Sequence, residues 1–162
     1  MNDEKKAILQ HLLATIAYRL QASLRGAPEG FGDLDPGHGI RPPKEIVRHV
    51  TAVLGYALSF FGDPNPKPER LATFEAEVRR LHGRLGDLGA RLAAGEEPSG
   101  MTWDRFVQGP LADALTHVGQ IAMIRRMAGS PVPGENFFRA AVDPANLGPD
   151  QPPPAAPRER KG

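Results

Sequence analysis

The chain has 162 residues with a formal net charge of +1, and it contains 18 glycines, 17 prolines and no cysteine. The balanced charge argues against nucleic-acid binding driven by overall charge. The lack of cysteine excludes disulfides, a cysteine nucleophile and thiolate metal ligands, so histidine and carboxylate side chains are the remaining candidate ligands. Because the prolines cluster and leave 1–27, 69–97 and 111–130 free of them, we expect one folded domain between these breaks.

The N-terminal sequence is a poor match to a secretory signal, because Gln10 and His11 interrupt the apolar stretch that follows the charged residues 3–6. The longest mostly apolar run, 50–61, is too short to span a bilayer. We therefore expect a cytoplasmic protein with no membrane partner.

Two helices are predicted in the first part of the chain. The first covers 5–25 and stops at Gly26, and apolar residues recur along it at helical spacing: Ile8, Leu12, Ile16 and Leu20. The second covers 43–61 after a loop rich in glycine and proline, and Pro43 is suited to its first turn.

Two further helices are predicted in the second part of the chain. The third covers 67–94 and has the strictest apolar pattern, in which the expected buried residues are Leu71, Phe74, Val78, Leu81, Leu85 and Leu88. A small residue at Gly89, beside this row, would permit a close helix approach. The fourth covers 103–128 and is restarted or kinked at Pro110. Because no stretch alternates with period two, the fold class expected is an all-α four-helix bundle.

The bundle is expected to occupy residues 1–130, and residues 131–162 form a C-terminal extension. The extension has a single apolar cluster around Phe137 and Phe138, followed by a Pro-rich segment. We expect at least one of these two rings to be buried against the bundle or a neighbouring subunit, and the residues after Pro152 to be exposed.

Among the five histidines, three give no indication of function. His82 flanks the leucine row and His38 lies in a glycine-rich loop, so both are expected to be solvated, whereas His11 is expected to pack at the edge of the core. Asp113 and His117 differ, because side chains four residues apart lie one above the other on a helix. Such a pair forms a local ion pair or supplies two ligands to one cation.

His49 extends this pair to a three-residue set. It lies at the edge of the apolar arc of the second helix, where a side chain can reach the mouth of the bundle while remaining packed. His49, Asp113 and His117 would give two imidazoles and one carboxylate from two helices. Three protein ligands leave positions for water or substrate, as catalytic metal sites do.

The sequence from Asp113 to Ile121, continuing through residues 125–129 (Arg-Arg-Met-Ala-Gly), resembles the last-helix signature of the DinB-like superfamily. In that signature a His-x3-His pair is followed by Gly-Gln and then by Arg before a closing Gly. Residues 41–50 resemble the start of that family's second helix, which carries its first metal-ligand histidine, here His49. The resemblance implies the family's four-helix bundle over about residues 1–130.

Asp113 stands where the family has the first histidine of its pair. The resulting carboxylate-x3-His is similar to the arrangement in the mycothiol-dependent isomerase branch, where both residues bind zinc; the alternative is a metal site that has decayed. The resemblance implies Zn²⁺ or Ni²⁺ as cofactor and a low-molecular-weight thiol cosubstrate that attacks a small electrophilic substrate. Hydrolysis by a metal-activated water uses the same residues.

Two more residues are candidates for cofactor or substrate binding. Gln120 lies one turn beyond His117, where it orients a ligand or packs between helices, and Arg125 holds an anionic group or forms a salt bridge to the extension. The alternative function is a non-enzymatic helical module for interaction or dimerisation with a degenerate metal site. In either case the expected assembly is a homodimer that binds no nucleic acid.

Overall fold

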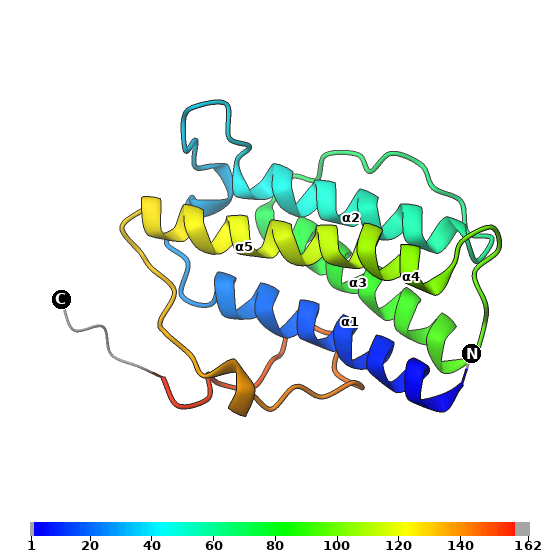
Figure 1. Cartoon of the computed structure of the whole chain (residues 1–162). Helices are drawn as coiled ribbons and strands as arrows, with labels where there is room; N and C mark the ends of the chain where they lie inside the picture. The colour runs from blue at the N-terminus through cyan, green and yellow to red at the C-terminus, as the bar shows by residue number, and fades with distance from the viewer. Residues whose placement is uncertain (1, 158–162) are drawn as a thin grey trace.

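A computed structural model describes residues 2–157 and shows an all-helical bundle (Figure 1). Its elements are α1 (Asp3–Leu24), α2 (Pro43–Ser59), α3 (Phe74–Ala93) and a last helix composed of α4 (Trp103–Phe106), a π-helical turn (Val107–Leu111) and α5 (Ala112–Met127). The part of the chain that the structure describes contains no β-strand. The predicted all-α four-helix bundle is therefore confirmed.

The four long helices form a ring in which α1 contacts α3 and α5, and α2 contacts the same two helices. Helices α2 and α3 run in the same direction, because the connection 60–73 returns along the outside of the bundle before α3 begins (Figure 1). Helix α5 runs antiparallel to α2 (Figure 1). The second turn of α2, which carries His49, therefore lies beside the first two turns of α5, which carry Asp113 and His117.

The core is made of the inward rows of all four helices. The third-helix row is buried from Val78 onward: Val78, Leu81, Leu85, Leu88 and Leu92. The expectation that Leu71 and Phe74 are buried is wrong, because both are partly exposed. No helix among the described residues is long and apolar enough to cross a bilayer.

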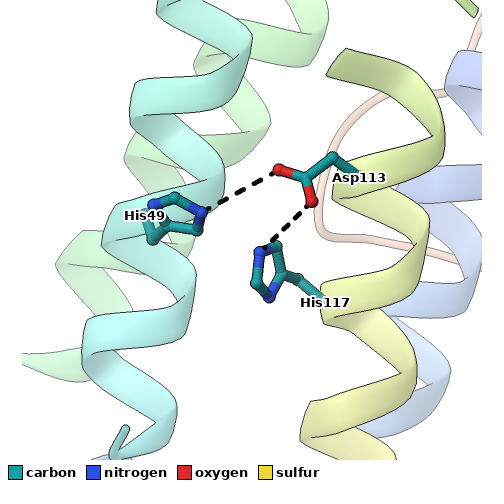
Figure 2. A group of neighbouring side chains, drawn as sticks. All are labelled: His49, Asp113 and His117. Carbon is teal, nitrogen blue, oxygen red and sulfur yellow. Dashed lines mark ion pairs between the residues drawn. The ribbon is translucent and has the colours of Figure 1, made fainter. Parts of the chain in front are cut away.

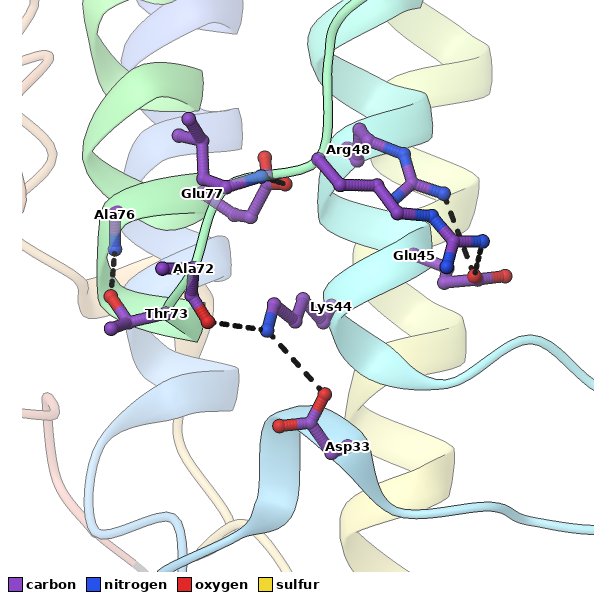
Figure 3. Close-up of polar contacts among 10 residues, drawn as sticks. Asp33, Lys44, Glu45, Arg48, Ala72, Thr73, Ala76 and Glu77 are labelled. Carbon is purple, nitrogen blue, oxygen red and sulfur yellow. Dashed lines mark hydrogen bonds and ion pairs between the residues drawn. The ribbon is translucent and has the colours of Figure 1, made fainter.

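Helix α3 begins at Phe74 and not at residue 67 as predicted. Thr73 is its N-cap, and the Thr73 hydroxyl accepts a hydrogen bond from the Ala76 N–H at 3.1 Å (Figure 3). The buried Glu77 carboxylate reaches back and accepts a hydrogen bond from the Leu71 N–H at 2.9 Å, and it also pairs with Arg80. These contacts hold the residues before Thr73 outside the helix, so Leu71 follows the apolar pattern without being helical.

The first turn of α2 is fixed to the start of α3 (Figure 3). Lys44 Nζ donates to the Ala72 carbonyl at 2.8 Å and lies 3.5 Å from Asp33. Glu45 accepts a hydrogen bond from Arg70 at 2.9 Å. Because these contacts fix the position of the first turn of α2, they also fix the orientation of the side chains one turn further along the helix.

The last helix changes its winding at Val107–Leu111, where Gly109 and Pro110 lie. Pro110 has no N–H and cannot continue an α-helical hydrogen-bond ladder, which accounts for the wider π-helical turn there. The predicted interruption at Pro110 is confirmed. Asp113 follows immediately, in the first turn of α5.

The extension runs along the outside of α1 and α3 (Figure 1). The Leu147 side chain packs over Gly89, where a Cβ atom would overlap it. The close approach expected at Gly89 is therefore made by the extension and not by a helix. His82, expected to be solvated, is buried beneath the same segment with 4% of its surface exposed.

Both nitrogens of His82 are hydrogen-bonded. Nδ1 lies 2.7 Å from the Leu147 carbonyl, and because a carbonyl only accepts, Nδ1 carries the proton. Nε2 lies 2.8 Å from Gln21 Nε2 of α1 and accepts from it. Burial lowers the pKa of His82, and the bond to Leu147 opposes this shift. His82 is thus a neutral link between α1, α3 and the extension.

The rings of Phe137 and Phe138 are less buried than expected. Phe137 contacts Tyr18 edge to face, at 6.4 Å between ring centroids, and it is 38% exposed, whereas Phe138 is 97% exposed. The extension is anchored by polar contacts as well, since Glu135 accepts hydrogen bonds from Tyr18 and from the Ala155 N–H. Pro153, Ala156 and Pro157 are exposed but residues 154 and 155 are partly covered, and residues 158–162 lie outside the described part.

Candidate metal centre

His49 reaches the site from the edge of the buried face of α2. Its neighbours Ile46 and Val50 are fully buried in the core, whereas the His49 side chain is 37% exposed. The edge position predicted from the sequence therefore places the imidazole between the core and the solvent, pointing toward α5 (Figure 2).

Asp113 and His117 lie one helical turn apart on the face of α5 that is directed toward α2 (Figure 2). His117 Nε2 is 3.6 Å from Asp113 Oδ1, and His49 Nε2 is 3.9 Å from Asp113 Oδ2. The two imidazole rings meet edge to face with their centroids 4.6 Å apart. His49, Asp113 and His117 therefore converge as expected, but they do so between the sides of α2 and α5 and not at an end of the bundle.

One ligand atom from each of these three residues lies within 4.8 Å of the others, so the group could hold a metal ion. A tetrahedral ion with bonds of about 2.0–2.2 Å places its ligand atoms roughly 3.3–3.6 Å apart. The observed separations from the Asp113 oxygens are at or slightly above this range. Binding one ion through all three residues therefore requires small movements of the imidazole rings as well as of the exposed Asp113 carboxylate.

Gln120 fixes the tautomer of His117. Its Oε1 atom lies 2.8 Å from His117 Nδ1, and the oxygen accepts the Nδ1 proton. Nε2, which faces Asp113, is then left with its lone pair free to bind a cation. Metal-binding histidines regularly use the second ring nitrogen in this way. The structure thus gives Gln120 a contact with a ligand residue, which the sequence alone left open between orientation and packing.

The pKa of His49 is lowered. Burial is the largest cause, and the nearby His117 and Arg41 side chains act in the same direction, whereas the Asp113 carboxylate raises the pKa. His49 is therefore neutral at pH 7, which is the protonation state that a metal ion requires of an imidazole.

Two clefts lie beside the group, one lined by His117 and the other by Asp113. One has a volume of about 350 Å³ and contacts His117 and Gln120 on one side and Arg41 on the other. The second, of about 570 Å³, lies toward the π-helical turn and contacts Asp113 and Tyr56. His117 lines the first cleft and Asp113 lines the second, so each cleft reaches one of the three residues directly. Arg41 is a residue that sequence reasoning missed; its place directly before Pro42 and Pro43 was the available signal.

Arg125 does not join this site. It is 2% exposed and donates hydrogen bonds to the carbonyls of Ser23, Arg25 and Gly26 at 2.9–3.1 Å, and to Ser130. These acceptors belong to the end of α1 and to the segment after α5. Arg125 therefore links the C-terminal end of α1 to the segment after α5, and its guanidinium N–H groups donate hydrogen bonds within this link.

No family model matches the chain, and searches of curated proteins and of solved structures also gave no match. Fold and site together define a helical-bundle protein with a two-histidine, one-carboxylate group that could hold a metal ion.

Proposed function

We propose that the protein binds one divalent cation, Zn²⁺ or Ni²⁺, through His49, Asp113 and His117. The observation that carries the proposal is the hydrogen bond from His117 Nδ1 to Gln120, because it turns the unprotonated Nε2 toward Asp113 and His49. Two imidazoles with one carboxylate suit Zn²⁺ or Ni²⁺ better than Mg²⁺ or Ca²⁺, which prefer oxygen ligands.

The donor set leaves room for a further ligand. Three protein ligands do not complete the coordination of either ion, and clefts lie beside His117 and beside Asp113. When bound, such a cation ionises a thiol or a water molecule near neutral pH.

The resemblance to the DinB-like superfamily supports a thiol-dependent transferase or isomerase reaction in the cytoplasm. A thiol cosubstrate would supply the nucleophile that this cysteine-free chain lacks. Hydrolysis at the same residues is the second chemistry of this proposal. In both cases the protein residues have the same roles: His49, Asp113 and His117 would hold the cation, Gln120 orients His117, and the clefts admit the substrate.

The direct test is metal titration of the full chain after purification without an affinity tag and after chelator treatment. We expect one Zn²⁺ or Ni²⁺ per chain by calorimetry, and a d–d spectrum of low coordination number with Co²⁺ as a substitute. Asp113→Asn should weaken binding at least about tenfold and His117→Ala should abolish tight binding, with far-ultraviolet circular dichroism unchanged.

The matched control is His11→Ala, because His11 is exposed on α1 and is not part of the site. It should bind the cation as the native chain does. Absence of binding by the native chain, or equal binding by the Asp113 and His117 variants, would contradict the proposal. The chain would then be better explained as an interaction or homodimerisation module with a degenerate metal site.

A further inference from the structure

The cleft between the 39–41 segment and α5 has two chemically different walls. Its volume of about 350 Å³ is near the lower end for sites that bind small molecules. His117 and Gln120 stand on one side of it, so the cleft opens on the proposed metal ligands. The remaining described lining residues are Gly39, Ile40, Arg41, Met123, Ile124 and Met127.

The apolar wall is exposed to an unusual degree. Ile40 is 41% exposed, Met123 is 56% exposed and Met127 is 50% exposed. The two methionines lie one turn apart on α5, and both belong to the lining of the cleft. Flexible thioether side chains adapt to ligands of varied shape, which favours binding of an apolar group here.

Arg41 supplies the only charged side chain among the described residues that line this cleft. It is exposed, and it makes no hydrogen bond or ion pair with any described residue. Its backbone is nevertheless restricted, because it precedes Pro42 and Pro43 at the start of α2. Arg41 is thus a guanidinium held at a fixed point of the chain, free to form a two-point contact with a carboxylate.

We propose that this cleft binds a small organic carboxylate whose acid group pairs with Arg41 and whose apolar arm lies against Ile40, Met123 and Met127. The inference rests on the proposed function, because such a ligand would carry its reactive group to the ion held beside His117. It deepens that function by naming the substrate class, an anion with an apolar arm. Among the described residues, no acidic side chain lines the cleft to compete for the guanidinium.

The test uses the full chain with [¹³C]methyl-labelled methionine and hexanoate as the probe. The chain has four methionines, of which Met123 and Met127 report on the cleft, whereas Met101 lies outside it and is an internal reference. Hexanoate should shift the Met123 and Met127 methyl signals and leave that of Met101 unchanged. Hexanamide, which has the same shape without the charge, should bind at least about fivefold more weakly.

Arg41→Gln should bring the affinity for hexanoate down to that for hexanamide, and Arg79→Gln should leave it unchanged. Arg79 is the matched control because it is an exposed arginine on α3, which does not contribute to the cleft. Equal binding of hexanoate and hexanamide, or equal binding by the native chain and Arg41→Gln, would overturn the proposal. So would methyl shifts that depend on protein concentration alone, because a second copy of the chain would then fill the cleft.

The measurement is made on both the metal-free and the Zn²⁺-treated protein. Hexanoate binding to the metal-free protein tests the cleft, and metal titration tests the three ligands, so the two proposals can fail separately. In the metal-free protein, loss of selectivity for hexanoate overturns the cleft assignment even if the cation binds normally.

Discussion

Leu147 lies directly on the backbone of α3 at Gly89, so that the extension and the helix touch where a side chain would otherwise stand. Gly86, one turn closer to the start of α3, has nothing within 4 Å of the place where its Cβ would be. The two glycines therefore have different roles in the same helix. One permits the extension to dock, and the other only lowers helix propensity.

Gly89→Leu is expected to release the extension while α3 remains helical. Amide hydrogen exchange should speed up across residues 131–157, because the new side chain occupies the space where Leu147 packs. The hydrogen bond from His82 to the Leu147 carbonyl is then lost as well. Gly86→Leu is the control, and it should leave exchange in the extension unchanged while stabilising the fold by about 0.5–1 kcal/mol. Unchanged exchange in Gly89→Leu would show that Leu147 does not hold the extension.

Stability should fall as the pH is lowered from about 6.5, and His82 should account for much of the loss. Its pKa in the folded state is below the ordinary value, so the unfolded chain takes up the proton first. The stabilisation is complete above pH 6.5 and is lost as the pH falls toward the folded-state pKa. Urea midpoints measured from pH 8 to pH 5 should show a smaller slope for His82→Gln, whereas His11→Gln should keep the native slope.

Gln120→Leu should weaken metal binding by about tenfold or more while leaving the three ligands in place. The substitution removes the oxygen that accepts the His117 Nδ1 proton, so the ring is free to turn and to change tautomer. Gln120→Glu keeps an acceptor at the same position and should retain tight binding. Calorimetric titration with Zn²⁺ checks both variants, and equal affinity for native and Gln120→Leu proteins would remove Gln120 from the site.

Arg125→Met should destabilise the bundle by about 2–4 kcal/mol without changing the metal affinity. The substitution leaves buried carbonyls of Ser23, Arg25 and Gly26 without their donor at the end of α1. Chemical denaturation gives the stability, and titration at a temperature where the variant is folded gives the affinity. A change in metal affinity with unchanged stability would show that Arg125 contributes to the metal site and not to the stability of the bundle.

Helical periodicity predicts the bounds of a helix well where apolar packing against the other helices determines them. The second helix is predicted at 43–61 and observed at Pro43–Ser59, and the last is predicted at 103–128 and ends at Met127. The third begins later than predicted, because Thr73 and Glu77 hold the preceding residues by contacts that no apolar pattern encodes.

The sequence likewise predicts some of the important polar residues and not others. His49 is recognisable from its place at the edge of an apolar face, and Asp113 and His117 are recognisable from their spacing of four residues on one helix. Helix packing then brings the pair and His49 together. Arg125 and His82 are not predictable from spacing, since their partners come from distant segments. Ser23 lies on α1, and Leu147 lies in an extension whose path depends on individual contacts.

The order of the helices in the ring bears on how the chain reaches this structure. Of the neighbouring pairs, α2 and α3 are the consecutive long helices that touch, and they are parallel, joined by the outer connection 60–73 (Figure 1). No two consecutive long helices thus form an antiparallel hairpin, the local unit from which simple up-and-down bundles assemble. Contacts between distant segments must form early, and the entropy of closing those loops slows folding. We therefore expect slower, fully cooperative folding, in which neither half of the chain is stable alone.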